Sequence, residues 1–440
     1  MIAKQRVWLA PVVAFVISAL VVACAVTTTT AQPPPVRSAA RAGTFVPLQI
    51  GITHTQVSAD PWHDRALVAR EKRLLARRRR PQNQHIMGWG VENPQPRPGQ
   101  YRWAGLDRRI RLIRQTGGTP IITLCCAPDW MKGGTPGRTD WSLLERAPDP
   151  GHYDDFADLA RRVALRYPDV RYFQVWNEMK GFHDARRNTW DIAAYTRMYN
   201  KVYRAVKSAR PDAQVGGPYM PIDSWSTARR SSHPSHLRGP WGVVDKRALN
   251  AITYWLKHNA GADFIAIDMS TATNDKGLTT DPFAALGKLR AVTRWVHRRT
   301  DLPIWIAEWY PLPQRGSFPL RKQDAIMSAG LATMAAEGVS MVLLWGPQRG
   351  QPDGCRGCLW TVRKGVPRVT PAFVSSDQIA SLLDAGVSSD GVDLRGDVAA
   401  VRSGNGVFWV NKTPRGATGR HGANKVRLDP FETRLHALRR

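Results

Sequence analysis

The chain has 440 residues, and 43% of them are hydrophobic, so it can bury a large core. Its formal charge of +28 arises from 63 Lys and Arg against 35 Asp and Glu. This composition excludes disorder beyond the first residues, and the charge favours an anionic envelope polymer or a membrane surface as an electrostatic partner. A nucleic-acid partner is not expected, because no nucleic-acid-binding motif accompanies the densest basic run, Arg77–Arg80.

The start of the chain reads as an export signal over residues 1–31, with a basic beginning followed by the uncharged run Val7–Val26. That run is also long enough for a retained membrane anchor, and the residues before Cys24 resemble a lipoprotein signal, which would place a lipid on Cys24. All three alternatives predict an extracytoplasmic protein, secreted or anchored to the membrane. Residues 32–44 read as a Pro/Thr-rich tether.

Four cysteines follow Cys24, and they are Cys125, Cys126, Cys355 and Cys358. Outside the cytoplasm they are expected to pair as disulfides, with the connectivity left open. A zinc site at the C-x-x-C pair would need two more ligands at a matching spacing. A thiol nucleophile at Cys125 or Cys126 lacks a nearby histidine signature.

From residue 48 onward, short apolar runs alternate with helix-period segments about eight times, which is typical of parallel βα units. Eight strands in this length predict a (β/α)8 TIM barrel over residues 45–371. No nucleotide-binding glycine motif follows any of these strands. The predicted strands are Leu48–Thr53, His85–Trp89, Pro120–Cys125, Tyr172–Glu178, Gln214–Tyr219, Phe264–Met269, Ile304–Glu308 and Met341–Trp345. The predicted helices include Leu106–Ile113, Phe156–Val163, Trp190–Ala209, Lys246–Asn259, Phe283–His297 and Asp324–Glu337.

The character of the sequence changes after Pro371. A short helix over Phe373–Ala385 precedes small alternating runs that Gly, Asn and Pro interrupt. These runs are Val392–Leu394, Ala399–Arg402, Val407–Val410 and Lys425–Leu428. Residues 372–440 are therefore predicted to form a small β-rich accessory domain, with Phe408–Val410 as its core rather than as a sugar platform.

Two predicted strands end on a glutamate. The run Arg171–Lys180 alternates like a strand and leads to Glu178, and Leu302–Tyr310 leads to Glu308. Active sites of barrels lie at the carboxyl ends of the strands, so both side chains are expected at one site. Cleavage of a glycosidic bond needs one carboxylic acid to protonate the leaving oxygen and one carboxylate to attack or to activate water. The repulsion between the two should keep one protonated and the other ionised.

Further side chains on the same rim are candidates for sugar binding. Asn177 is expected to donate to the sugar 2-hydroxyl, and tryptophans offer flat apolar faces to a sugar ring. Asp268 is expected either to orient a catalytic glutamate or to cap a loop, and His54 either to bind hydroxyls or to be satisfied within the rim. Trp176 and Trp305 are expected to pack between strand and helix. The candidate substrate-binding residues are Asn177, His54, Trp130, Tyr219, Asp268, Trp309, Tyr310 and Trp345.

Several segments resemble clan A of the glycoside hydrolases, and more narrowly family 39, the β-xylosidase and α-L-iduronidase group. They are YRWAGLDRRIRLIRQTGGTPIITLCCAPDWM, VWNE, Gly216-Gly217-Pro218 and IAEWY, within roughly residues 48–350. The resemblance implies a retaining glycosidase in which Glu178 is the acid/base, Glu308 the nucleophile and Asn177 the 2-hydroxyl partner. It implies a carbohydrate substrate and no metal or organic cofactor.

Two positions depart from the family pattern. Family members usually carry His-x-Tyr at strand six, where this chain has Asp268-Met269-Ser270, and a basic residue or His with Gly at strand two, where it has Gly88-Trp89-Gly90. These departures leave the sugar open and keep a non-hydrolytic carbohydrate-binding barrel at the cell surface as the alternative. A third hypothesis is a basic scaffold for anionic polymers. The sequence predicts no oligomeric state.

Overall fold

The computed structural model describes residues 47–54, 58–59, 64–85, 93–275, 281–311, 318–348, 355, 357–387, 391–404, 406–421 and 424–437. The predicted export signal, lipid site, anchor and tether lie outside these ranges. Among the helices that the structure describes, none is both long and apolar enough to cross a membrane.

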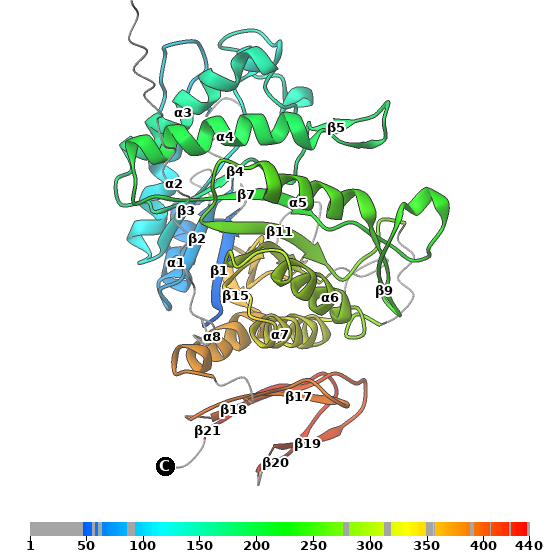
Figure 1. Ribbon diagram of the computed structural model, residues 1–440. Coiled ribbons are helices and arrows are strands. Elements are labelled where there is room, and N and C mark those ends of the chain that lie inside the picture. Colours follow the sequence, from blue (N-terminus) through cyan, green and yellow to red (C-terminus); the bar gives the residue numbers. More distant parts are fainter. Residues whose placement is uncertain are drawn as a thin grey trace, which may run out of the picture. The chain divides into compact units, whose positions relative to one another are not determined.

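Eight parallel strands close into a barrel in the order β1-β13-β12-β11-β7-β4-β3-β2 (Figure 1). Helices follow most of the strands along the chain, so the prediction of a (β/α)8 barrel is confirmed. The barrel strands are β1 (Gln49–His54), β2 (Pro81–Gln84), β3 (Thr119–Leu124), β4 (Tyr172–Val175), β7 (Gln214–Pro221), β11 (Phe264–Ser270), β12 (Ile304–Tyr310) and β13 (Met341–Trp345).

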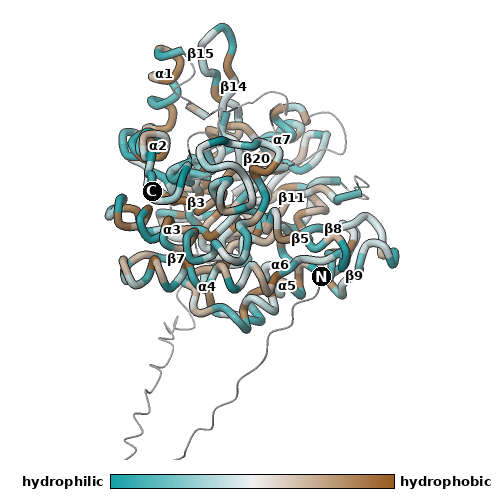
Figure 2. The backbone as a smooth tube through the Cα atoms, turned by 90° about the horizontal axis from the view of Figure 1, so that it is seen from above, coloured by the Kyte–Doolittle hydropathy of each residue, from teal (hydrophilic) through white to brown (hydrophobic). Residues whose placement is uncertain are grey.

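The helices bury one face each, and Figure 2 shows hydrophilic and hydrophobic segments alternating along them. In α3, for example, Phe156, Ala160 and Val163 are fully buried, and Arg166 is exposed at the last turn. The helix α7 is buried over nearly its whole length. The helices are α1 (Arg65–Leu75), α2 (Ala104–Gln115), α3 (Tyr153–Arg166), α4 (Ile192–Ala209), α5 (Lys246–His258), α6 (Leu286–His297), α7 (Leu320–Ala336) and α8 (Pro371–Asp384).

Small antiparallel pairings occupy the loops that follow β4, β7 and β13. The first is the pair β5 (His183–Asp184) and β6 (Thr189–Trp190). The second is the three-stranded sheet of β8 (Ser224–Trp225), β9 (Pro234–Gly239) and β10 (Gly242–Asp245). The third is the hairpin of β14 (Trp360–Arg363) and β15 (Val366–Val369).

A four-stranded antiparallel sheet near the C-terminus confirms the predicted β appendage. It contains β16 (Val392–Asp393), β17 (Val398–Ser403), β18 (Gly406–Asn411) and β21 (Thr433–Ala437), and β19 (Ala417–His421) pairs with β20 (Asn424–Leu428). Phe408, Trp409 and Val410 are buried, as predicted for its core. The sequence did not indicate β19 or β21, whose residues are mostly polar. The division into a barrel over residues 45–371 and an accessory domain over residues 372–440 stays a prediction.

Strand two begins earlier than predicted. The structure places β2 at Pro81–Gln84, whereas the sequence predicted His85–Trp89, so that prediction is wrong. A proline is tolerated at the first position of a strand, and Pro81 begins β2 in this way. The strand lacks an apolar signal because its polar side chains are buried and hydrogen-bonded on both faces. Asn83 Nδ2 donates to Thr53 Oγ1 inside the barrel over 3.2 Å, and Gln82 Oε1 lies 2.9 Å from His54 Nε2 on the side that faces the helices.

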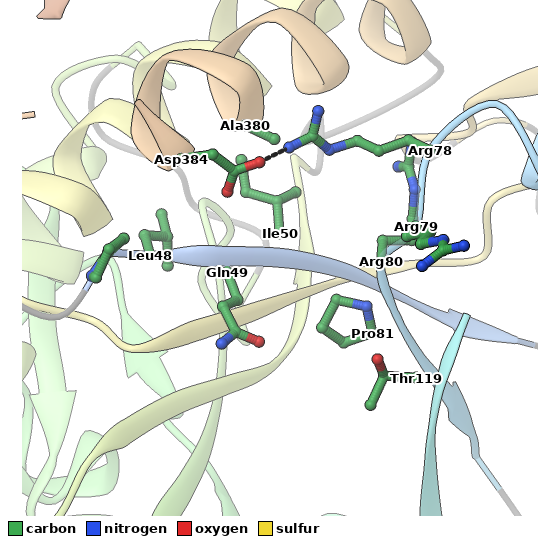
Figure 3. A pocket seen from close by; sticks show the side chains of 11 residues that line it. Leu48, Gln49, Ile50, Arg78, Arg79, Arg80, Pro81, Thr119, Ala380 and Asp384 are labelled. Carbon is green, nitrogen blue, oxygen red and sulfur yellow. Dashed lines mark hydrogen bonds and ion pairs between the residues drawn. The ribbon is translucent and has the colours of Figure 1, made fainter. Parts of the chain in front are cut away.

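A cavity of about 380 Å³ lies at the amino ends of β1, β2 and β3, where Gln49, Pro81 and Thr119 begin these strands (Figure 3). Three consecutive arginines, Arg78–Arg80, contribute to its wall, and Arg78 pairs there with Asp384. This cavity is at the opposite end of the barrel from the carboxyl ends of the strands.

Candidate active site

A β-bulge in β12 determines where Glu308 points. Trp305 and Ala307 belong to the apolar cluster inside the barrel, whereas Ile306 and Trp309 belong to the cluster outside it. Strict alternation would place Trp309 inside with Ala307, but the pairing with β13 shifts between Ile306 and Trp309. The shift turns Glu308 into the barrel, where it bonds to an interior tyrosine.

The same shift removes Trp309 from the candidate sugar-binding surface. Its ring is fully buried and lies against Gly330 of α7. Trp305 was predicted to pack between strand and helix, and this prediction is wrong. It lies inside the barrel, where its ring stacks on Phe264 with centroids 3.7 Å apart. The corresponding prediction for Trp176 is confirmed, because its buried ring contacts Phe156 edge-on outside the barrel.

Glu308 is held by two donors on one oxygen. The Tyr219 hydroxyl donates to Glu308 Oε1 over 2.5 Å, and His85 Nε2 lies 3.2 Å from the same oxygen. Only 3% of Glu308 is exposed. Burial and the neighbouring Glu178 raise the pKa of Glu308, and the contacts with His85 and Tyr219 work in the opposite direction.

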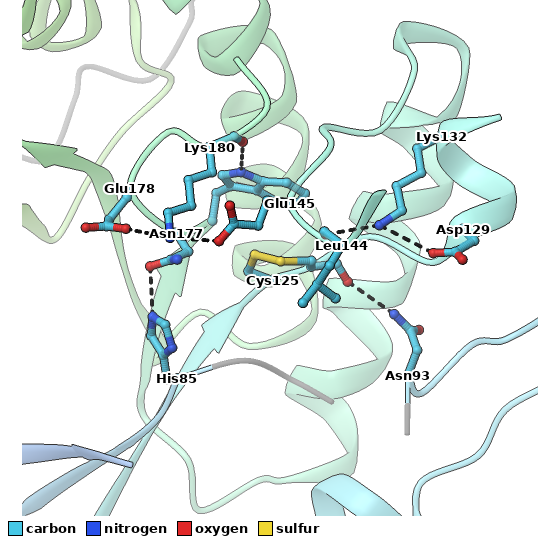
Figure 4. The surroundings of a disulfide bond; sticks show 12 residues. His85, Asn93, Cys125, Asp129, Lys132, Leu144, Glu145, Asn177, Glu178 and Lys180 are labelled. Atoms are coloured by element: carbon cyan, nitrogen blue, oxygen red, sulfur yellow. Dashed lines mark hydrogen bonds and ion pairs between the residues drawn. A yellow bond between two sulfur atoms is a disulfide. The ribbon is translucent and has the colours of Figure 1, made fainter. Parts of the chain in front are cut away.

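Asn177 lies beside this pair. His85 Nε2 is 2.8 Å from Asn177 Oδ1 (Figure 4). The same imidazole nitrogen lies 3.2 Å from Glu308 Oε1, so it reaches both side chains. With its oxygen occupied by His85, the Asn177 amide can turn its N–H groups toward a ligand.

Glu178 follows β4 in a tight turn, where Trp176, Glu178 and Met179 have φ angles of 71°, 46° and 56°. Its Oε2 lies 2.9 Å from Lys180 Nζ, and the same ammonium lies 2.7 Å from Glu145 Oε1 (Figure 4). Burial disfavours ionisation of Glu178, but the hydrogen bond with Asp268 and the Lys180 ammonium outweigh it and lower its pKa. The sequence led us to expect the raised pKa on the acid, whereas in the structure it falls on Glu308.

Asp268 completes a cluster of three carboxyl groups. Alternation along β11 points it into the barrel, and 5% of it is exposed. One oxygen each of Glu178, Asp268 and Glu308 lie within 4.8 Å of one another. Burial and the charges of Glu308 and Glu178 raise the pKa of Asp268 well above its usual range. Of the two roles that the sequence left open, the structure shows the contact with a candidate glutamate, Glu178.

Three carboxyl groups this close could also serve as ligands of a divalent cation. In this structure one oxygen of Glu178 pairs with the Lys180 ammonium, and one oxygen of Glu308 accepts a hydrogen bond from the Tyr219 hydroxyl. An ammonium group 2.9 Å from one ligand opposes the binding of a second cation. The ion pair with Lys180 therefore makes the cluster a poorer site for a cation than its three carboxyl groups alone would suggest.

The remaining candidates differ in their distance from this cluster. Trp345 borders it, since its ring meets His85 edge-on with centroids 4.7 Å apart. His54 is buried with Nδ1 3.1 Å from Ser58 Oγ, and burial lowers its pKa to about 4. Trp130 is half-buried and donates from Nε1 to the backbone of Gln95. Tyr310 ends β12 and is half-buried. Binding of sugar by these residues stays a prediction.

Sequence reasoning missed His85 and Lys180. The misplaced strand two caused the first omission, because the family position at strand two was sought in Gly88-Trp89-Gly90, whereas β2 ends at Gln84 and His85 follows it. Gly88-Trp89-Gly90 lie outside the described residues, so the departure inferred there stays a prediction. Lys180 lies two residues beyond Glu178, and only the tight turn brings its ammonium back.

The four cysteines after Cys24 form two disulfides, each between residues close together in the sequence. Cys125 is bonded to Cys126 directly after β3, and Cys355 is bonded to Cys358 (Figure 4 shows the first). This resolves the connectivity that the sequence left open. With both sulfur atoms in a disulfide, neither Cys125 nor Cys126 offers a thiolate as nucleophile.

A closed parallel barrel with two glutamates at the carboxyl ends of its strands is the arrangement expected of a glycoside hydrolase of the TIM-barrel class. Solved structures share this fold. A family 39 β-xylosidase from Caulobacter crescentus has a TM-score of 0.52 and 18% identity, covering 83% of this chain and 77% of that chain. A family 39 glycoside hydrolase from Bacteroides cellulosilyticus WH2 has a TM-score of 0.57 and 16% identity, covering 86% and 73%. Xylanase 10B from Thermotoga maritima has a TM-score of 0.50 and 15% identity, covering 76% and 95%.

A comparison with curated proteins finds no match. The sequence profile of glycosyl hydrolases family 39 matches residues 87–346, which is more than half of the chain. The chain therefore belongs to glycoside hydrolase family 39. It is a glycosidase with a carbohydrate substrate, and this assignment favours the enzyme over the non-hydrolytic alternative.

Proposed function

We propose that this glycosidase hydrolyses O-glycosidic bonds of a glycoside or polysaccharide by double displacement, with retention of anomeric configuration. The observation that carries the proposal is the spacing of Glu178 and Glu308, whose nearest oxygens lie within 4.8 Å. Retaining enzymes hold their two carboxyl groups about 5–5.5 Å apart, whereas inverting enzymes leave about 6.5–9.5 Å for a water molecule. A nearest-oxygen separation within 4.8 Å therefore supports the retaining arrangement.

In the first step Glu308 attacks the anomeric carbon and forms a glycosyl ester, while Glu178 protonates the departing oxygen. Both donors to Glu308 bind Oε1, so Oε2 is the oxygen left for attack. In the second step Glu178 takes a proton from water as that water cleaves the ester. Tyr219 and His85 keep the carboxylate fixed in both steps.

Asn177 is proposed to bind the sugar 2-hydroxyl. Its oxygen faces His85, which orients the amide nitrogen as the donor. A hydrogen bond at this hydroxyl strengthens as positive charge develops on the ring in the transition state. Loss of the amide should therefore lower kcat more than it raises KM.

The test compares the wild-type chain with Glu178→Gln and Glu308→Gln on a panel of aryl glycosides and oligosaccharides. Aryl β-D-xylosides are the first probe, because two of the structural neighbours are named β-xylosidases. Both variants should lose at least about 100-fold in rate on substrates with poor leaving groups, in the range that general acid catalysis contributes. Proton NMR should show the retained anomer as the first product. An inverted first product would overturn the proposal.

We also infer an extracytoplasmic location, secreted or held at the membrane through Cys24 or the N-terminal apolar run. The two disulfides support this proposal, because such bonds persist in oxidising compartments. Fractionation of cells that express the full chain tests it, with radiolabelled palmitate reporting a lipid on Cys24. Recovery in the cytosolic fraction with free thiols would contradict it.

An anionic envelope polymer or membrane surface is proposed as a further partner. The charge of +28 and the arginines around the cavity at the amino ends of the strands support this. Binding to vesicles that contain phosphatidylglycerol should fall steeply between low and physiological salt. Equal binding to neutral phosphatidylcholine vesicles would contradict an electrostatic origin.

A further inference from the structure

We propose that Asp268 holds the acid proton in the resting enzyme and passes it to Glu178, so that the two carboxyl groups act as one acid/base unit. The proposal rests on the proposed function, since Glu178 is the acid/base there. It adds a positioning residue whose role neither the fold nor the family assignment gives.

The contact between the two carboxyl groups requires a shared proton. One oxygen each of Asp268, Glu178 and Glu308 lie within 4.8 Å of one another, and a side-chain hydrogen bond between Asp268 and Glu178 lowers the pKa of Glu178. Because a carboxylate is an acceptor only, one partner of that bond must be protonated. Asp268 is the more enclosed group, with 5% exposed, and its Oδ1 is buried without a hydrogen-bond partner among the described residues. A protonated carboxyl tolerates such an environment far better than a carboxylate does.

The neighbouring charges place the proton on Asp268. Lys180 lies 2.9 Å from Glu178 Oε2 and favours the ionised form of Glu178. Asp268 instead faces Glu308, with which it is paired across β11 and β12, and that charge disfavours a second anion. The other charged and titratable groups around Asp268 and Glu178 are His85 after β2, Tyr219 in β7, Asp223 after β7, and Lys288 in α6. Accordingly the pKa of Asp268 is raised and that of Glu178 is lowered.

The number of negative charges in the cluster then stays constant through the first step. Before it, Glu178 and Glu308 are anions and Asp268 is neutral. The Oδ–H bond of Asp268 breaks as an Oε–H bond forms on Glu178, and Glu178 gives this proton to the glycosidic oxygen as Glu308 becomes a neutral ester. Asp268 and Glu178 are then the two anions. In the second step the proton of the attacking water returns through Glu178 to Asp268, and Glu308 is released as a carboxylate.

The first test locates the proton without any substrate. The infrared spectrum of the free protein at pH 7.5, recorded in H₂O and D₂O, should contain a protonated carboxyl band that Asp268→Asn removes. Glu178→Gln should shift the band, because it replaces the charged acceptor. Asp223→Asn is the matched control, since Asp223 is a half-buried carboxyl whose charge also acts on Glu178 but which hydrogen-bonds to Asn274. It should leave the band in place. An Asp268→Asn spectrum that matches the wild type in this region would overturn the proposal.

The second test asks whether turnover needs the proton of Asp268. Its substrates are aryl glycosides of the sugar that labelling with 2-deoxy-2-fluoro glycosides identifies. Asn at position 268 can donate to Glu178 but has no proton to give. For a phenyl glycoside, Asp268→Asn should lower kcat/KM by about 100-fold or more, the size expected for general acid catalysis. For a dinitrophenyl glycoside, which needs no acid, the loss should stay within about fivefold. Asp268→Glu should recover part of the phenyl glycoside rate. Equal losses on both substrates would show that Asp268 has a structural role and does not supply the acid proton.

The two proposals fail separately. A chain without glycosidase activity that keeps the band of Asp268 would refute the proposed function and leave the proton assignment standing. An active retaining enzyme without that band would support the proposed function and refute the assignment of the proton to Asp268.

Discussion

The hydroxyl of Tyr219 lies 2.5 Å from Oε1 of Glu308, and both side chains are buried inside the barrel. Tyr219 has a φ of 53° and Glu308 follows a bulge in its strand, so irregular backbone on two strands brings the two groups together. The hydroxyl stabilises a carboxylate that burial and the neighbouring Glu178 would otherwise tend to protonate.

Tyr219→Phe is expected to move the acidic limb of the kcat/KM profile to higher pH. Glu308 must be ionised to attack, and the lost hydrogen bond lowered its pKa, so the pKa rises in the variant. We expect kcat/KM at neutral pH to fall about 10- to 100-fold, as for the loss of one hydrogen bond to a charged group. An unchanged acidic limb would show that Tyr219 does not set the protonation of Glu308.

Lys180→Met is expected to move the basic limb to higher pH. The Lys180 ammonium lowers the pKa of Glu178, so its removal keeps the acid protonated over a wider range. Lys201→Met is the control, because Lys201 pairs with Asp154 on the surface and has no contact with the site. A shift of the same size in both variants would point to the general charge of the protein rather than to this ion pair.

Gly330→Ala is expected to destabilise the protein by about 1–3 kcal/mol, as for overpacking of a core. A Cβ at this position of α7 would collide with the ring of Trp309, which sits beside Glu308 on β12. Activity should fall together with stability, since movement of Trp309 displaces its neighbour. Gly151→Ala serves as the control, because no atom of the residues that the structure describes lies within 4 Å of an added Cβ there. Urea denaturation of both variants measures the difference.

Asp324 should make stability depend on pH in an identifiable way. Its carboxyl is buried and accepts hydrogen bonds from Ser328, Ser375 and Thr433, and burial raises its pKa from 3.8 to about 6. A raised pKa in the folded state means that stability is fully present below pH 3.8 and is lost as pH rises to about 6. The shift corresponds to about 3 kcal/mol.

The measurement is the difference in unfolding free energy between the wild type and Asp324→Asn from pH 4 to pH 7. The variant cannot ionise, so its advantage over the wild type should grow across this window. A difference that does not change with pH would refute the assignment of Asp324 as the titrating group.

The barrel could be predicted because its outer faces follow simple rules. Residues such as Phe156 and Val163 repeat with the period of a helix that covers a sheet, and most strands carry continuous apolar runs. The polar strand β2 escaped these rules, because Gln82 and Asn83 are satisfied by partners such as His54 and Thr53 from a neighbouring strand. Such pairings are visible only in three dimensions.

The two glutamates could be proposed from their place at strand ends, but their orientation could not be derived. Alternation alone would send Glu308 out of the barrel and Trp309 into it, and the bulge reverses both. The electrostatics of Glu178 were also beyond reach, because Lys180 returns to it through a turn in left-handed conformations and Asp268 comes from another strand. The simple alternation of side chains along a strand predicts neither the bulge in β12 nor the turn after β4.

The most direct test of the account is intact-mass spectrometry after incubation with 2-deoxy-2-fluoro glycosides that carry activated leaving groups, with pentosides and uronides included. These reagents stall a retaining enzyme at its glycosyl ester. We predict one sugar adduct, located on Glu308 by peptide mapping, absent from Glu308→Gln and retained by Asp223→Asn. An adduct on any other carboxylate, or turnover of the parent glycoside without an adduct, would contradict the proposed nucleophile.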